Sequence, residues 1–147
     1  MIRIVEVTDG AGAVAAPDWL AKAETVHRQL RTALPADYEG KMKRVFAGGA
    51  RMCVAAEGDS VRGVAVYRIV ENTFEGLHLY CDDLVTDERE RSKGVGRALM
   101  EHMQKLARAA GCEAYTLDSG TQRQQAHKFY FREGMVVTSF HFRKPLK

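Results

Sequence analysis

The segment from residue 77 to residue 111 constrains the fold of this chain more than any other stretch. Its first part, Leu77–Thr86, is a mostly apolar run that is typical of a β-strand. A short basic loop with two glycines follows at residues 91–97. Beyond it, apolar side chains recur at the spacing of one helix face, and Gly111 stands where a helix end favours glycine. These apolar positions are Val95, Leu99, Met103, Leu106 and Ala110. The segment therefore predicts a strand, a basic glycine loop and a helix in succession.

Three cations crowd the start of the predicted helix: Arg91, Lys93 and Arg97. Because a helix N-terminus has unpaired N–H groups and a partial positive charge, each cation there destabilises the helix by about 0.3–1 kcal/mol. A bound anion would remove this conflict, since the N–H groups, the dipole and the basic side chains would all face it. Gly94 and Gly96 lack a Cβ, so the backbone could approach a phosphate closely. The charges and glycines alone fit a solvated basic turn equally well.

The loop does not match two common phosphate-binding motifs. No Walker sequence is present, and a dinucleotide fingerprint would need a third glycine where Leu99 stands. The Arg-x-x-Gly-x-Gly sequence instead resembles the coenzyme A loop of the GNAT (GCN5-related) N-acetyltransferases. The resemblance implies that the loop holds the pyrophosphate of acetyl-CoA. The cofactor-binding residues so implied are Arg91, Ser92, Lys93, Gly94, Val95, Gly96 and Arg97.

Composition narrows the class of protein. With 147 residues, 46% of them hydrophobic and 28% charged, we expect one globular domain over residues 1–147. A formal net charge of +3 is too small to indicate a nucleic-acid-binding protein. No apolar run is long enough to span a bilayer, and the N-terminus lacks a signal-peptide pattern. The three cysteines, Cys53, Cys81 and Cys112, predict neither disulfides nor a zinc site, so we expect a cytoplasmic protein without a metal.

Hydrophobic periodicity predicts elements in the order β-α-α-β-β-β-α-β-α-β, which is an α+β pattern. The predicted strands are Ile2–Val7, Met52–Ala56, Val61–Val70, Leu77–Thr86, Ala114–Leu117 and Met135–Phe142, and the predicted helices are 17–34, 38–46, 95–110 and 122–133. The GNAT acyl-CoA N-acyltransferase fold has this order. The resemblance, which now extends over nearly the whole chain, implies a mixed, mostly antiparallel, twisted sheet with helices on both faces.

A second motif lies near the end of the chain. Residues 126–135 read Ala-His-Lys-Phe-Tyr-Phe-Arg-Glu-Gly-Met, which resembles the Ala-x-x-x-Tyr-x-x-x-Gly-Phe helix of the same family. The resemblance implies that Tyr130 protonates the departing thiolate of coenzyme A, which a phenol with a pKa of about 10 is able to do. By spacing alone, Tyr130 also fits an aromatic side chain packed on a helix face. Arg123 stands where many relatives carry an asparagine that contacts the cofactor, so we expect a cofactor contact there.

Two acids lie in the central predicted strand. Because side chains alternate along a strand, Asp82 and Asp83 are expected to point to opposite faces. An ammonium must lose a proton before its nitrogen attacks a thioester, and a nearby carboxylate can take that proton, directly or through water. The resemblance implies that role for Asp82, whereas Asp83 is expected to pair with a basic residue; both also fit ordinary strand-end charges. It further implies that the backbone of Leu84, Val85 and Thr86 binds the thioester carbonyl and pantetheine.

The sequence therefore predicts an acetyl-CoA-dependent N-acetyltransferase that moves the acetyl group to a primary amine of a small molecule or protein, directly within one ternary complex. Residues 17–50 are expected to form the acceptor site. Carboxylates near the predicted site favour a cationic amine; they are Asp82, Asp83, Asp87, Glu88 and Glu90. The identity of the acceptor, the length of the acyl group and a monomeric or homodimeric state stay open.

Two other classes of protein also fit parts of this pattern. One is a non-catalytic CoA-binding module that has kept the fold without turnover. The other is a basic-loop protein that binds nucleic acid or another phosphorylated partner. Nucleic-acid binding would be supported by aromatic residues interleaved with the basic ones, and the loop at residues 91–97 has none.

Overall fold

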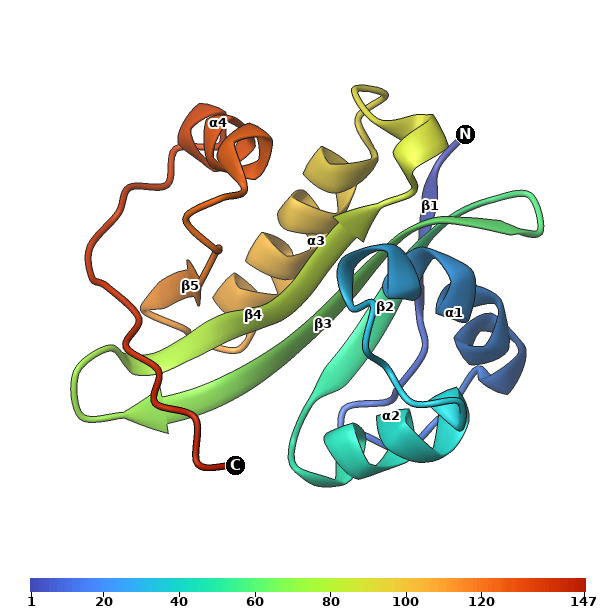
Figure 1. The fold of residues 1–147 in the computed structure, drawn as a ribbon, viewed down its shortest axis with the longest axis horizontal. Coiled ribbons are helices and arrows are strands. Elements are labelled where there is room, and N and C mark those ends of the chain that lie inside the picture. Colours follow the sequence, from blue (N-terminus) through green and yellow to red (C-terminus); the bar gives the residue numbers. More distant parts are fainter. The chain divides into compact units, whose positions relative to one another are not determined.

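A five-stranded sheet organises the first part of the chain (Figure 1). The computed structural model describes residues 1–147, which divide into two compact units, Met1–Thr116 and Leu117–Lys147. The elements are β1 (Arg3–Glu6), α1 (Pro17–Leu30), α2 (Tyr38–Ala47), β2 (Arg51–Glu57), β3 (Ser60–Asn72), β4 (Gly76–Thr86), the 3₁₀ turn η1 (Glu88–Glu90), α3 (Val95–Ala109), β5 (Ala114–Leu117) and α4 (Gln124–Arg132). Helix α4 belongs to the second unit. None of the helices combines the length and apolar character that a membrane span requires.

The strands lie in the order β1-β2-β3-β4-β5. The pairs β1–β2, β2–β3 and β3–β4 are antiparallel, which confirms the predicted α+β class and the mixed, mostly antiparallel sheet. One residue interrupts the β3–β4 register. Val66 lies opposite Asp83 and Tyr67 lies opposite Cys81, so Asp82 is an extra residue on β4 without a partner on β3. This β-bulge disturbs the regular alternation of faces along β4.

Helices α1 and α2 cover one face of this sheet. Pro17 occupies the first turn of α1, where an N–H would have no helical partner. The Asp37 side chain accepts a hydrogen bond from the Gly40 N–H (2.9 Å) and so caps α2. Apolar side chains of both helices pack against inward residues of β2, β3 and β4. This core includes Leu20, Ala23, Val26, Tyr38, Met42, Phe46, Val54, Val64, Val66 and Val85.

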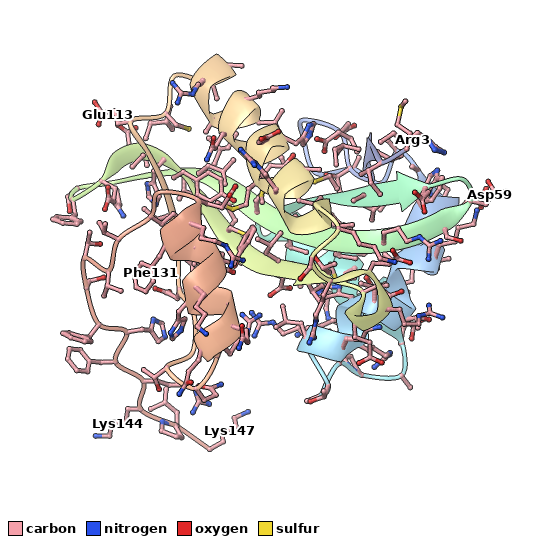
Figure 2. The ribbon with its side chains drawn as sticks, turned by 90° about the horizontal axis from the view of Figure 1, so that it is seen from above. Arg3, Asp59, Glu113, Phe131, Lys144 and Lys147 are labelled. Carbon is pink, nitrogen blue, oxygen red and sulfur yellow. The ribbon has the colours of Figure 1, made fainter.

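Helix α3 covers the other face, as the view from above shows (Figure 2). Its buried residues recur at helical spacing, which confirms the helix predicted from residue 95. Gly63 of β3 allows its close approach, because a Cβ there would lie 2.7 Å from Val95 Cγ1 and 2.9 Å from Leu99 Cδ1. The start of α3 is thereby packed directly on β3. The buried residues of α3 are Val95, Leu99, Met100, Met103 and Ala107.

Helix α1 ends at Leu30 rather than at residue 34, so the longer predicted helix was wrong. Arg31 leaves the helical conformation with φ −108° and ψ 80°, and its Nε binds the carboxylate of Asp83 (2.6 Å). This tertiary ion pair competes with a further helical turn, and Pro35 has no N–H with which to extend the helix. Leu34 still packs against the core, although not as part of the helix.

The chain after α4 forms no strand, so the strand predicted at Met135–Phe142 was wrong. A strand is stable only when its backbone N–H and C=O groups are paired, and this segment has no partner strand. Large apolar side chains at both even and odd positions of the segment remain 70–91% exposed, so neither face of the predicted strand is buried. They are Val136, Val137, Phe140 and Phe142. Period-two alternation predicted a strand here without indicating which segment would pair with it.

Candidate active site

The predicted cofactor loop lies between β4 and α3 and follows the 3₁₀ turn η1. Two of its residues have left-handed backbone conformations, Ser92 with φ 66° and Gly94 with φ 84°. Such conformations turn the chain sharply, and glycine adopts them without the strain that a Cβ would cause. Gly94 is the N-cap of α3, which begins at Val95. The sharp turn delivers the chain from the end of β4 to the start of the helix.

The first turn of α3 has backbone donors without partners. No side chain caps this helix end, and no acidic residue lies in its first turn. The first helical hydrogen bond runs from the Ala98 N–H to the Gly94 carbonyl (3.0 Å), so the three preceding N–H groups of the helix have no partner in the protein. These donors and the positive end of the helix dipole form a place for an anion.

The three basic side chains of the loop differ in their partners. Lys93 Nζ lies 3.2 Å from Glu90 Oε2, and Arg97 Nε lies 3.1 Å from Glu101 Oε1. Arg91 is exposed and has no ion-pair partner. Both basic side chains are well exposed, so each ion pair contributes little to the stability of the fold. Either side chain can therefore leave its carboxylate partner and bind a phosphate at a small cost in free energy. The loop therefore has one unpaired cation and two weakly paired ones beside the free N–H groups.

The two acids of β4 face the same side of the sheet, so the predicted opposite orientation was wrong. Asp83 binds side chains from α1 and its C-terminal end. Asp82 binds Arg68 of β3, whose Nη1 also donates to the carbonyl of Gly48 at the end of α2 (3.2 Å). The bulge at Asp82 is the cause, because an extra residue puts two successive side chains on one face.

Asp83 is held by two basic side chains. Its Oδ2 lies 2.7 Å from His27 Nε2, and its Oδ1 accepts a hydrogen bond from Arg31 Nε (2.6 Å). Burial by itself raises the pKa of this carboxyl, but the bond to His27 and the charge of Arg31 outweigh burial and lower the pKa below its ordinary value. The prediction that Asp83 pairs with a basic residue is confirmed. Both of its oxygens are occupied, so Asp83 is poorly placed to take a proton from a substrate.

His27 is buried and links Asp83 to α2. Its Nδ1 lies 2.9 Å from the Tyr38 hydroxyl, and the two rings meet edge to face. Burial raises the pKa of Tyr38, so its hydroxyl stays protonated. The Nε2–H of His27 donates to Asp83, so the imidazole links the Asp83 carboxylate to the Tyr38 hydroxyl. Sequence reasoning gave His27 no role, because its spacing indicates only a core helix face and its partner lies 56 residues away.

Asp82 is the more accessible of the two acids. Its side chain is 26% exposed, against 14% for Asp83. Burial raises the pKa of Asp82 by more than the ion pair with Arg68 (2.9 Å) lowers it. The surroundings therefore push the pKa values of two neighbouring carboxyls in opposite directions, which is typical of acid–base sites. Of the two, Asp82 is the one suited to bind and release a proton.

Strand β4 extends past β5 beyond the bulge. β4 has 11 residues and β5 has 4. The chain enters β5 where the Glu113 N–H donates to the Leu77 carbonyl (2.7 Å), near the beginning of β4. Leu84, Val85 and Thr86 pair with β3 along one edge. Because β5 has only four residues and the chain enters it beside Leu77, β5 ends before it reaches Leu84 on the other edge of β4 (Figure 1).

Asp87 fixes the junction between β4 and the loop. Its buried carboxylate accepts hydrogen bonds from the Arg89 N–H (3.2 Å) and Gln29 Nε2 (3.3 Å), and pairs with Arg89 Nη2 (3.0 Å). These bonds cap η1 and tie it to α1. Hydrogen bonds from Arg89 lower the pKa of Asp87 to about 2. Sequence reasoning counted Asp87 as a charge near the site, whereas the structure shows a buried anchor of the loop.

The second unit contains the other two predicted site residues. Tyr130 is on α4 and only 8% exposed, with its ring edge-on to Phe129 (5.5 Å between centroids). Arg123 is the N-cap residue of α4, and its side chain makes no capping hydrogen bond. The same short helix therefore carries Arg123 at its start and Tyr130 in its last turn. The Arg123 side chain is not used for holding the helix end.

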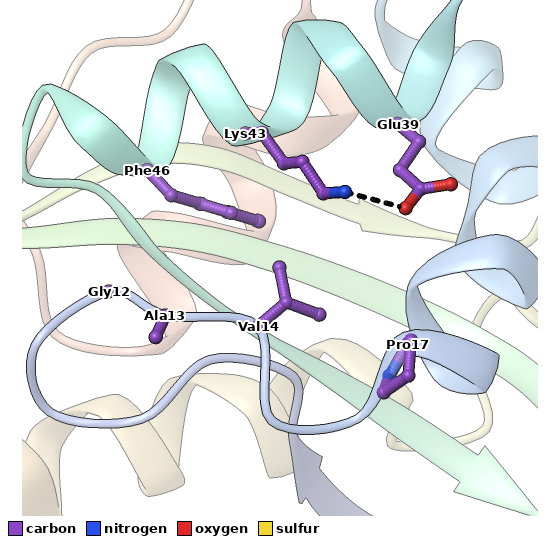
Figure 3. A pocket seen from close by; sticks show the side chains of 7 residues that line it. All are labelled: Gly12, Ala13, Val14, Pro17, Glu39, Lys43 and Phe46. Carbon is purple, nitrogen blue, oxygen red and sulfur yellow. Dashed lines mark ion pairs between the residues drawn. The ribbon is translucent and has the colours of Figure 1, made fainter.

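An open cavity of about 440 Å³ lies elsewhere in the first unit, between the β1–α1 loop and α2 (Figure 3). An exposed ion pair between Glu39 and Lys43 (3.0 Å) forms one of its walls. None of the predicted site residues lines this cavity, so we do not assign it to the active site. Its lining residues are Gly12, Ala13, Val14, Pro17, Glu39, Lys43 and Phe46.

Three potential metal ligands meet on the α3 face of the sheet. Glu6, Cys53 and His102 have ligand atoms within 4.8 Å of one another. Glu6, however, already bonds to both His102 and Tyr67. Burial raises the pKa of the Cys53 thiol well above its ordinary value, and a protonated thiol is a poor metal ligand. The group serves as a hydrogen-bonded link between β1, β3 and α3.

Comparisons with known proteins identify the family of the chain. The model of the acetyltransferase (GNAT) family matches residues 17–135. The uncharacterized N-acetyltransferase YhdJ of Bacillus subtilis is 33% identical over 144 residues, with 88% of this chain and 92% of the relative covered. The aminoalkylphosphonate N-acetyltransferase of Salmonella typhimurium is 36% identical over 64 residues, with 44% of this chain and 42% of the relative covered.

A solved structure shows the same fold. AAC(6')-Iy, in complex with the bisubstrate analog CoA-S-monomethyl-acetylneamine, superposes with a TM-score of 0.77. The sequence identity is 15%, and the superposition covers 99% of this chain and 99% of that chain. At this identity the likeness supports the fold of the chain and not its substrate.

We predict that Asp87→Asn lowers the free energy of unfolding at pH 7 by about 1–2 kcal/mol. The neutral amide of asparagine accepts the hydrogen bonds of Arg89 less strongly than the buried carboxylate does. The folded-state pKa of Asp87 is depressed, so its contribution to stability is complete above the unfolded value of about 4 and is lost as the pH falls toward 2. Urea unfolding at pH 7 and pH 3 should therefore show a smaller difference between the two proteins at pH 3.

The matched control is Asp59→Asn, which changes an exposed carboxylate at the tip of the β2–β3 turn and should alter stability little at either pH. An equal loss of stability for Asp87→Asn at both pH values would contradict the assignment of a depressed pKa to Asp87.

Proposed function

The chain belongs to the acetyltransferase (GNAT) family and is an acetyl-CoA-dependent N-acetyltransferase, and we propose that it acetylates a primary amine by direct transfer within one ternary complex. The observation that carries this proposal is the carboxylate pair of β4. One member, Asp83, is held in its ionised form, and the other, Asp82, is accessible with a raised pKa. Such a pair supplies a base for the amine, and the glycine loop at residues 91–97 supplies a place for the cofactor.

The loop is the proposed binding site for the pyrophosphate of acetyl-CoA. The unpaired N–H groups of the first turn of α3 donate to phosphate oxygens, and three basic side chains add charge. The pantetheine arm then follows the outer backbone edge at residues 84–86. Arg123 of α4 is a further proposed cofactor contact. The proposed cofactor-binding residues are Leu84, Val85, Thr86, Arg91, Ser92, Lys93, Gly94, Val95, Gly96, Arg97 and Arg123.

Asp82 is the proposed general base. An alkylamine is mostly protonated at neutral pH and has to lose a proton to become a nucleophile. Asp82 takes that proton, directly or through one water. Its raised pKa supports this role, because a base is more effective when its pKa lies nearer the working pH. Asp83 remains ionised and anchors α1, through His27 and Arg31, beside the base.

The transfer then proceeds in two steps. The amine nitrogen attacks the thioester carbonyl carbon, forming the N–C bond, and the developing oxyanion is stabilised by a backbone N–H of residues 84–86. The C–S bond breaks as the intermediate collapses, and the departing thiolate takes the phenolic proton of Tyr130. The second amine proton and the proton held by Asp82 pass to solvent, from which Tyr130 is reprotonated, so one proton is released per turnover. The products are the acetylated amine and coenzyme A.

The environment of Cys81 supports direct transfer. This thiol precedes the two acids on β4 and is 3% exposed. Burial raises its pKa to about 12, so it is protonated at neutral pH and a poor nucleophile. A covalent acetyl-enzyme would need a reactive thiolate, and Cys81 does not provide one.

We further propose that residues 1–147 act as one acetyltransferase domain. The family match at residues 17–135 crosses the boundary between the two units and includes Tyr130. The three cysteines are free, which supports the proposal of a reducing, cytoplasmic environment.

The loop assignment predicts that Arg91→Ala raises the Kd for acetyl-CoA about tenfold, because one charged hydrogen bond to a phosphate is lost. Isothermal titration, or the acetyl-CoA-induced rise in Tm, measures the change. Arg108→Ala, at an exposed position in the last turn of α3, is the matched control and should leave the Kd unchanged. Equal Kd values of wild type and Arg91→Ala for acetyl-CoA would contradict the assignment of the loop to the cofactor site.

The base assignment predicts that Asp82→Asn lowers kcat by about 10²–10⁴-fold with an unchanged Kd for acetyl-CoA. Wild-type kcat/KM should fall as the pH drops through the raised pKa of Asp82, since the base is then protonated. Thiol release measured over the whole pH range in which the protein stays folded should show this acidic limb in wild type and in the control Asp59→Asn. An identical acidic limb in Asp82→Asn would assign the base to another group.

The acid assignment predicts that Tyr130→Phe lowers kcat by about 10²-fold while acetyl-CoA binds normally. The lost hydroxyl is the proposed proton donor, and phenylalanine preserves the ring on α4. Tyr67→Phe, which removes a hydroxyl that donates to Glu6 of β1 (3.1 Å), is the control and should keep its turnover. Full turnover by Tyr130→Phe with normal binding would contradict the proposed role.

A further inference from the structure

Two arginines contact the proposed base. Arg31 follows the last turn of α1; its Nη2 donates to the backbone carbonyl of Asp82 (2.9 Å), and its Nε binds the Asp83 carboxylate (2.6 Å). Arg68 of β3 binds the Asp82 carboxylate through its Nε (2.9 Å). Both guanidinium groups therefore meet at Asp82, one at its carbonyl and the other at its carboxylate.

Each guanidinium keeps donors that the protein does not use. An arginine side chain has five N–H donors on three nitrogen atoms. Arg31 bonds through Nε and Nη2 and leaves Nη1 without a partner, while Arg68 bonds through Nε and Nη1 and leaves Nη2 without one. Their side chains are 50% and 33% exposed. Unused donors and solvent access occur together beside the proposed base.

The charges of the two acids and the two arginines cancel. Asp82 and Asp83 carry two negative charges, and Arg31 and Arg68 carry two positive ones. A cluster without net negative charge attracts a polycation weakly, and its exposed guanidinium groups repel one at short range. The sequence-based expectation of a cationic acceptor counted the carboxylates but not these arginines, which lie 51 and 14 residues from Asp82 in the chain.

We propose that the acceptor is a small amine that also carries a carboxylate or phosphonate close to its amino nitrogen. The oxyanion accepts hydrogen bonds from the free donors of Arg31 and Arg68, for which a planar guanidinium is well suited. Because both arginines touch Asp82, a short spacer then brings the amino group to the base. This inference rests on the proposed N-acetyltransferase function and specifies the substrate class of that site.

The first experiment measures thiol release from acetyl-CoA by the full-length protein with matched acceptors. Glycine and β-alanine are compared with glycinamide and β-alaninamide, aminomethylphosphonate tests the phosphonate, and spermidine tests a polycation. Values of kcat/KM are expressed per unprotonated amine, so that differences in amine pKa do not decide the result. We expect at least about a tenfold preference for a carboxylate- or phosphonate-bearing amine over its uncharged partner and over spermidine.

The second experiment tests Arg31 with three variants. Arg31→Gln should raise KM for the acid-bearing acceptor about tenfold, with little change for an amide acceptor or for acetyl-CoA. Arg31→Lys keeps the positive charge but lacks the planar guanidinium, so its KM for the acid-bearing acceptor should lie between the values of wild type and Arg31→Gln. Arg108→Gln removes a cation from an exposed position on α3 and should change neither KM. The wild-type panel does not depend on whether an Arg31 variant folds.

The outcomes separate this inference from the proposed function. Turnover of amides or spermidine at least as fast as that of acid-bearing amines would overturn the inference and keep the N-acetyltransferase. An equal loss of kcat/KM on all acceptors for Arg31→Gln would also overturn it, since Arg31 would then only hold Asp83. Tight acetyl-CoA binding with no turnover of any amine would overturn the proposed transfer itself, and the inference with it.

Discussion

The extra residue at Asp82 in β4 is the constraint on which the rest of the site depends. Without the bulge, Asp82 and Asp83 would point to opposite faces of the sheet, one toward α1 and α2 and one toward α3. With it, both carboxylates lie on the α1 side and share a single cluster of partners. The end of α1 follows from the same arrangement, because Arg31 leaves the helix to bind this cluster.

Two neighbouring carboxyls acquire different functions from their surroundings. Asp83 is held by a buried imidazole, itself bonded to Tyr38, and by a guanidinium, so its negative charge is compensated and its oxygens are occupied. Asp82 has one side-chain partner, Arg68, and its side chain is more exposed to solvent than that of Asp83. The ion pair with Arg68 does not offset the effect of burial, so the pKa of Asp82 is raised. Asp83 therefore ties α1 and α2 to the central strand, while Asp82 remains available for proton transfer. Because one carboxylate holds the structure and the other transfers protons, the site can be rigid and still contain a general base.

Periodicity and turn residues predicted most of the elements, because each depends on local sequence. The helix beginning at Val95 followed from its apolar spacing and the preceding Gly94, and both are features of consecutive residues. The site could be predicted only in part. A bulge has no clear signature in the run around Asp82, and the partners His27 and Arg31 lie more than 50 residues away. The strand expected near Phe140 failed for the same reason, since alternation does not reveal a partner.

The most direct test is a crystal structure of the protein with coenzyme A and an acid-bearing amine. We expect the pyrophosphate on the backbone N–H groups of residues 95–97. We also expect the amino nitrogen within hydrogen-bond distance of the Asp82 carboxylate, directly or through one water, and the oxyanion on Arg31 and Arg68. A cofactor bound away from the start of α3, or an amine on the opposite face of β4, would contradict this arrangement.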